Sequence, residues 1–160
     1  MRSMRQVVTI PLVLLLLGAS TPVAPAASDE DRARQLQKER QQLEKETDPV
    51  DRAKIGIRIS ELLLEDVAES VKKENFTAME QQLTQYSDTI QRAHQSLVDS
   101  GRDAVKKPDG FKQFEIVLRK HTRKFEDFGR MLNLQRRVPL EKTKELARAI
   151  QEKLLKALFP

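Results

Sequence analysis

The chain of 160 residues contains no cysteine and no tryptophan, and only 4% of its residues are aromatic. The absence of cysteine excludes disulfide bonds, thiolate metal ligands, cysteine nucleophiles and lipid anchors attached through cysteine. The shortage of large aromatic side chains argues against a deep ligand pocket, which such side chains usually line. Hydrophobic residues still make up 39% of the chain, which is enough for one packed domain. A slender helical assembly fits this composition.

Long apolar runs are also missing, apart from a short one near the N-terminus. Val7 to Leu17 follows Arg2 and Arg5 and precedes small residues that include Ala24-Pro25-Ala26. A basic, an apolar and a small-residue segment in this order are typical of a secretory signal peptide. The run is shorter than the roughly 18 to 20 residues of a membrane-spanning helix. We therefore expect residues 1–27 to be a signal peptide, cleaved between Ala26 and Ser28; an uncleaved anchor helix is the alternative.

Export and charge together restrict the partners that we expect. The mature chain is expected outside the cytoplasm, in the periplasm or secreted, and in contact with a membrane only transiently, through the signal peptide. Without Arg2 and Arg5, 27 of the 29 Lys and Arg residues stand against 24 Asp and Glu, so the formal net charge falls from +5 to +3. This small excess, outside the cytoplasm, does not favour a nucleic-acid partner.

Proline and glycine are sparse after residue 27, and residues that favour helices dominate. Three prolines, Pro49, Pro108 and Pro139, stand where the apolar pattern restarts, which predicts a helix start at each. A first helix over about 28–46 is polar, with Leu36 and Leu43 as its main apolar residues. A second helix over about 49–73 is apolar around most of its circumference, and we expect it to be the buried central helix.

The next two helices have regular apolar seams. One seam contains Phe76, Met79, Leu83, Tyr86, Ile90, Ala93 and Leu97; the other contains Phe111, Phe114, Leu118, His121, Phe125, Phe128 and Leu132. Both alternate steps of three and four residues, which is typical of packed helices. We expect them to form an antiparallel pair across the Pro108-Asp109-Gly110 turn, and a last helix to start at Pro139.

The fold class predicted by these patterns is all-α. A single domain over residues 48–160 is expected to form an elongated antiparallel helical bundle of about four core helices. Residues 28–47 are expected to form a polar helical extension that precedes it, either loosely attached or completed by a partner.

Motifs that carry chemistry are absent from the sequence. His94 and His121 have no acidic residue three or four positions before them, so neither forms the Glu-x-x-His pattern of bundle metal sites. No phosphate-binding loop, nucleophile elbow or zinc-protease motif is present. We therefore expect a protein that is not an enzyme and that holds no cofactor and no metal.

Apolar residues supply the candidate surface for a partner or ligand. Its members are Leu36 and Leu43 on the first helix and a cluster on the fourth, namely Phe111, Phe114, His121, Phe125 and Phe128. Seam spacing equally predicts that the phenylalanines are core residues. For His121, a neutral core imidazole and a pH-responsive group both stay open.

Three functional interpretations follow. The first is an exported, non-enzymatic protein of the cell envelope that acts through protein–protein interaction or self-association. The second is a periplasmic small-molecule or metal-responsive sensor with a pocket of phenylalanines and His121. The third rests on Leu83-Thr84-Gln85-Tyr86-Ser87, which resembles the Leu-Thr-x-x-Gln repeat of small exported helical-hairpin chaperones but has Ser87 in place of glutamine. That resemblance implies an envelope chaperone-like helical hairpin.

Overall fold

The computed structural model describes residues 27–160, and nearly all of the predicted signal peptide lies outside the described residues. Within this range the chain forms five helices and no strand, which confirms the all-α prediction. The helices are α1 (Ala27–Lys45), α2 (Pro49–Lys72), α3 (Phe76–Asp99), α4 (Phe111–Met131) and α5 (Leu134–Leu158). None of them is both long enough and apolar enough to cross a membrane.

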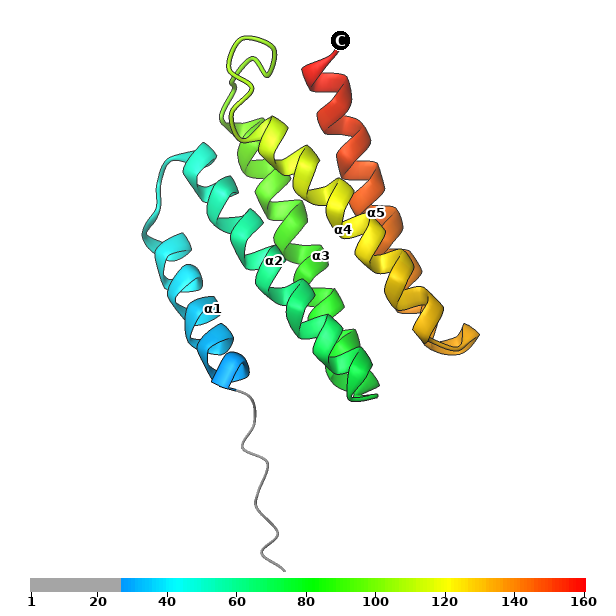
Figure 1. Ribbon diagram of the computed structural model, residues 1–160. Helices are drawn as coiled ribbons and strands as arrows, with labels where there is room; N and C mark the ends of the chain where they lie inside the picture. Colours follow the sequence, from blue (N-terminus) through cyan, green and yellow to red (C-terminus); the bar gives the residue numbers. More distant parts are fainter. Residues whose placement is uncertain (1–26) are drawn as a thin grey trace, which may run out of the picture.

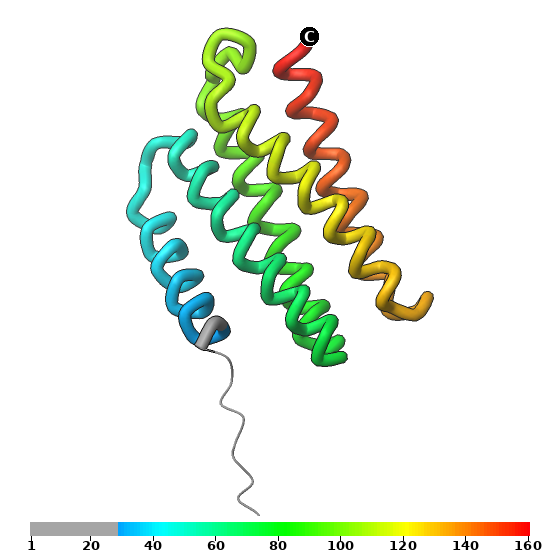
Figure 2. Tube along the Cα trace, viewed as in Figure 1, coloured from blue at the N-terminus to red at the C-terminus, as the bar shows by residue number. Residues whose placement is uncertain are grey.

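Helices α2 to α5 form a bundle, and α1 lies on its outside (Figures 1 and 2). The packed pairs of the bundle are α2 with α3, α3 with α5, α5 with α4, and α4 with α2, whereas α1 packs against α2. In Figure 1 the α2–α3 pair and the α4–α5 pair are each antiparallel, and α1 runs antiparallel to α2. The bundle is therefore built from two helical hairpins laid side by side.

Local sequence signals explain most of the helix starts. The side chain of Asp48 accepts hydrogen bonds from the backbone N–H groups of Val50 and Asp51, and Pro49 occupies the first helical position of α2, where its missing N–H has no helical partner to lose. At the start of α4, Gly110 has a φ of 83°, a conformation that L side chains rarely adopt.

The predicted start of the last helix is wrong. We expected Pro139 to open it, but α5 begins at Leu134, and Pro139 lies inside the helix. The side chain of Asn133 caps α5 by accepting from the N–H of Arg136 at 3.0 Å. An asparagine cap stabilises a helix because it satisfies a free N–H of the first turn. Helix α5 therefore begins at Leu134, five residues before Pro139.

The two seam helices α3 and α4 run antiparallel, as predicted (Figure 1), but the prediction that they pack as neighbours is wrong. The backbone neighbours of α3 are α2 and α5, not α4. The physical reason is the connection between them, because residues 100–110 are long enough to cross the end of the bundle. Ala104 in this connection is buried. The two seams face each other across the core and meet through side chains alone, as Tyr86 and Phe125 do.

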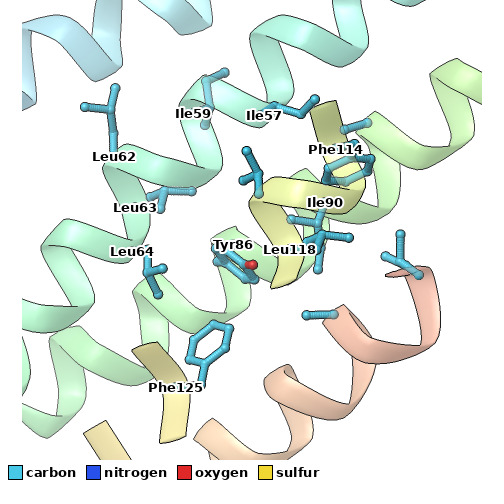
Figure 3. Close-up of a cluster of buried hydrophobic side chains, with 14 of the residues drawn as sticks. Ile57, Ile59, Leu62, Leu63, Leu64, Tyr86, Ile90, Phe114, Leu118 and Phe125 are labelled. Carbon is cyan, nitrogen blue, oxygen red and sulfur yellow. The ribbon is translucent and has the colours of Figure 1, made fainter. Parts of the chain in front are cut away.

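The prediction of α2 as the central helix is confirmed by burial. Thirteen of its residues are buried, from Val50 to Val71. Gly56 lets α3 approach closely, since a Cβ atom at this position would lie 3.0 Å from the Cβ of Ala93. Side chains from α2, α3 and α4 fill the space between the helices (Figure 3). Seam residues Met79, Ile90, Phe114, Leu118 and Phe125 are fully buried there.

Candidate functional site

The predicted surface on α4 lies mostly in the core. Phe114 and Phe125 have no exposed area and Phe111 is buried, while Phe128 is half-buried against the same core. Phe125 packs edge-on against Tyr86, with ring centroids 5.3 Å apart, and against Phe128 at 6.5 Å. Phe111, Phe114 and Phe125 are therefore core residues, and of the four phenylalanines only Phe128 keeps partial exposure to solvent.

His121 is buried beside the only tyrosine of the chain. The Tyr86 hydroxyl lies 2.9 Å from Nδ1 of His121, a distance at which the two neutral groups share a hydrogen bond. Burial, helped by the nearby charges of Lys124 and Lys120, lowers the pKa of His121 to about 3. Burial also raises the pKa of Tyr86 above its ordinary value. Both side chains are therefore uncharged near neutral pH.

The attachment of α1 to α2 combines two leucines with polar contacts. Leu36 is buried and Leu43 is partly buried against the core. The Arg32 guanidinium forms an ion pair with Asp66 of α2. Near the other end of the helix, Arg52 of α2 donates to the carbonyl oxygens of Leu43 and Glu46 at 2.9 and 2.7 Å. A salt bridge of 2.8 Å between Glu39 and Arg58 lies between these ends.

A cleft lies on each side of α1. One of about 360 Å³ is lined by residues of α1, α2 and α3, among them Leu43, Gly56, Ile59, Thr89 and Ala93. The other, of about 390 Å³, is lined by residues of α1, α2 and α4, among them Gln35, Glu61, Leu62, Lys120 and His121. We call α1 together with these two clefts the α1 surface. Of the residues predicted to bind a partner, Leu43 lines the first cleft, His121 lines the second, and Leu36 is buried on α1 between them.

Polar groups line both clefts. In the α1–α3 cleft, Arg40 donates to Gln85 at 2.7 Å, and Arg92, Glu44 and Asp88 also line the walls. Among the described residues, no carboxylate lies within 4.0 Å of the Arg40 or Arg92 guanidinium. The cleft therefore has positively and negatively charged side chains around an apolar floor. Such a surface can bind a polar surface of opposite charge pattern, because each charge can form an ion pair with its counterpart.

Two features that can mark a chemical site are absent from the described residues. Residues 27–160 contain no group of three or more His, Asp or Glu side chains placed to hold a metal ion. No buried side-chain nitrogen or oxygen in this range lacks a hydrogen-bond partner. Comparison of the chain with protein-family models, with curated proteins and with solved structures finds no match.

Sequence reasoning did not find the clefts. They depend on how α1 lies against α2, and the polar first helix gives little indication of its partner. One signal was present, since a central helix that is apolar on nearly all sides needs a cover on each side. Gly56 was a second signal, because glycine inside a helix commonly marks a close approach.

Proposed function

We propose that this protein is an exported, non-enzymatic helical protein of the cell envelope that acts through protein–protein interaction, and that the α1 surface is where its partner binds. The observation that supports the proposal is the largely polar attachment of α1 to α2, through two leucines and ion pairs, with a cleft on either side. Partners commonly bind where apolar area is rimmed by polar groups. Here Leu43 is partly exposed above the buried Ile59 and Leu62, and Arg40, Arg92, Glu61 and Lys120 supply the rim.

A photo-crosslinking side chain placed in each cleft tests this proposal. We choose Thr89 for the α1–α3 cleft and Glu61 for the α1–α4 cleft. Glu145 is the control, because it is exposed on α5, which does not contact α1. Irradiation of producing cells should give one discrete protein adduct from the cleft positions and none from Glu145. Adducts of equal yield at all three positions, or none at the clefts, would contradict the proposal.

A matched pair of charge reversals sharpens the result. Arg40 and Arg34 are both exposed arginines on α1, but only Arg40 lines a cleft, whereas Arg34 forms exposed ion pairs within its own helix. Arg40→Glu should reduce the adduct formed from position 89, and Arg34→Glu should leave it unchanged. Equal effects of the two reversals would show that the net charge of α1, and not the cleft, decides the interaction.

A small-molecule binding protein is the second candidate, and a specific observation favours it. The α1–α3 cleft of about 360 Å³ has the size of a ligand site, and it contains the Arg40 and Arg92 guanidinium groups over an apolar floor. Native mass spectrometry of the protein as isolated from its producing cells separates the two candidates. A retained mass in the small-molecule range supports the second, and a stoichiometric protein complex supports the first.

A further inference from the structure

Three of the most exposed apolar side chains of the described chain gather at one turn. Met131, Leu134 and Val138 are 61%, 80% and 66% exposed. Met131 ends α4, Leu134 opens α5, and Val138 lies one helical turn after Leu134 on the same face. Large apolar residues on soluble proteins are usually scattered singly. We call these three residues the tip patch.

Arginines surround the tip patch, and two of them are free of carboxylates. Arg130 forms an ion pair of 3.2 Å with Asp127. The Arg136 guanidinium instead lies over the ring of Phe76, 4.6 Å from its centroid. Arg137 donates through Nε to the carbonyl oxygen of Leu132 at 2.7 Å. Among residues 27–160, no carboxylate lies within 4.0 Å of Arg136 or Arg137, so their positive charges are not neutralised locally.

The tip patch lies at one end of the bundle. In Figures 1 and 2 the α4–α5 turn and the α2–α3 turn are at the lower end, and residues 100–110 and the C-terminus are at the upper end. The contact between Arg136 and Phe76 joins the two lower turns. The acidic residues at the start of α1 belong to a helix that packs on α2, and Asp29 among them is already paired with Arg32 and Lys73. The immediate surroundings of the tip patch are therefore apolar and basic, while the exposed Glu74 lies on the other turn at this end.

We propose that the tip patch binds the surface of an anionic lipid bilayer. Met131, Leu134 and Val138 would enter the boundary between headgroups and acyl chains, while Arg136 and Arg137 contact lipid phosphates. Apolar side chains beside basic ones give this kind of interfacial binding, in which burial and attraction to anionic lipid add together. Met131 and Leu134 are exposed at the turn between α4 and α5. An exposed turn at the end of two helices can enter the headgroup region of a bilayer, which deforms around it.

This proposal is independent of the α1 surface, which lies on other helices. It departs from the expectation, drawn from the sequence, that the chain meets a membrane only transiently. A partner protein at the tip patch is the competing occupant. Charge favours the lipid, because no carboxylate pairs with Arg136 or Arg137 and an anionic bilayer presents net negative charge over its whole surface.

Co-sedimentation of the exported protein with lipid vesicles tests the proposal. Vesicles of phosphatidylglycerol and phosphatidylcholine should bind the protein, and vesicles of phosphatidylcholine alone should not. We expect Leu134→Ser together with Val138→Ser to lower the partition coefficient about tenfold or more, through the loss of apolar burial. Arg136→Gln or Arg137→Gln should each lower it about fivefold. All four residues are exposed or half-exposed, so these variants keep the core intact.

Val105→Ser is the matched control, because Val105 is 55% exposed at the other end of the bundle. It should bind anionic vesicles as the wild type does. Retained binding by the Leu134→Ser, Val138→Ser variant would overturn the proposal and assign binding to another segment. Equal binding to neutral and anionic vesicles would overturn it as well, since the arginines would then contribute nothing.

The absence of cysteine allows a second readout. A single cysteine at position 134, labelled with an environment-sensitive fluorophore, should shift its emission to the blue on anionic vesicles, and this shift should decrease at high salt. The same label at position 74, on the α2–α3 turn at the same end of the bundle, should shift much less. Equal shifts at positions 134 and 74, or no shift at 134, would contradict insertion of the tip patch.

Discussion

Helices α1 and α3 both pack on α2, but they do so through different forces. Six buried side chains, from Met79 to Leu97, attach α3, and the contact at Gly56 brings its backbone close to that of α2. Helix α1 buries Leu36, partly buries Leu43, and is otherwise held by ion pairs and hydrogen bonds with clefts on both sides. One central helix thus has a neighbour held by apolar packing and another held largely by polar contacts.

The different contacts of α1 and α3 indicate which helix separates from the bundle first. Burial of a large apolar side chain contributes about 1.5 to 3 kcal/mol, whereas an ion pair near the surface contributes about 0 to 1 kcal/mol and weakens in salt. Local unfolding begins where buried apolar contacts are fewest. We therefore expect α1 to separate from the bundle well before α3 does.

The largest expected loss of stability results from cavities in the core between α3 and α4. Replacing Ile90 or Leu118 by alanine should lower the free energy of unfolding by about 2 to 4 kcal/mol, because both side chains are fully buried and each change leaves a cavity. Urea unfolding monitored by circular dichroism measures the loss. A loss below about 1 kcal/mol would mean that this core is loosely packed and that the contrast with α1 does not hold.

The next effect is a pH dependence caused by His121. Burial lowers its pKa to about 3 in the folded protein, while the unfolded chain has the ordinary value of about 6.5. Between these values only the unfolded chain binds the proton, so stability is complete above about pH 6.5 and falls as the pH decreases toward 3. The free energy of unfolding should decrease by about 2 kcal/mol between pH 6.5 and 5.

Two variants isolate this contribution. His121→Leu should remove most of the pH dependence but leave the Tyr86 hydroxyl without its partner, which costs about 1 to 3 kcal/mol at every pH. Tyr86→Phe combined with His121→Leu removes both partners and should keep the flat profile with a smaller loss. Thermal melts across this range provide the measurement. Wild-type and mutant profiles that run parallel would show that His121 does not cause the dependence.

A smaller effect distinguishes the two helical glycines. Gly56→Ala should destabilise the protein by about 1 to 2 kcal/mol, because the new Cβ would lie 3.0 Å from that of Ala93 and would push α3 away from α2. Gly129→Ala should stabilise the protein by up to about 1 kcal/mol, because alanine favours the helical conformation more than glycine does. The new Cβ would lie 3.7 Å from the Glu141 side chain, which is an ordinary van der Waals contact. Chemical denaturation of both variants should therefore give changes of opposite sign.

The smallest effect is expected on α1. Leu36→Ala should cost about 1 kcal/mol or less, because the helix can shift toward α2 where few apolar neighbours hold it. We compare this variant with Leu118→Ala in the same urea series. If the two losses were equal, α1 would belong to the cooperative core, and the distinction between the neighbours of α2 would disappear.

The sequence predicted the helices better than their arrangement. Asp48-Pro49 marked the start of α2 correctly, and regular apolar spacing identified the buried faces of α3 and α4. Pro139 predicted the wrong start for α5, because the asparagine cap at Asn133 begins the helix several residues ahead of the proline.

The pairing of helices could not be inferred in the same way. Two seams in succession indicate that both helices have an inner face, and this pattern is the same for adjacent and for diagonal helices. The choice depends on the path of residues 100–110 and on the close approach of Gly56 to Ala93. The α1 surface is a product of that arrangement. The sequence therefore predicted Leu43 and His121 as site residues, but it did not predict that they line two separate clefts on either side of α1.

The two ends of α1 are held to α2 by different kinds of contact. The hydrogen bonds of Arg52 tie the carbonyl oxygens of Leu43 and Glu46 to α2, whereas the opposite end of α1 is held by the ion pairs of Arg32 with Asp66 and of Asp29 with Lys73. We therefore expect the first turn of α1 to separate from α2 more readily than residues 43–46 do. Salt screens the ion pairs at that end more than it weakens the hydrogen bonds of Arg52, so a rise in ionic strength should loosen the start of α1 first.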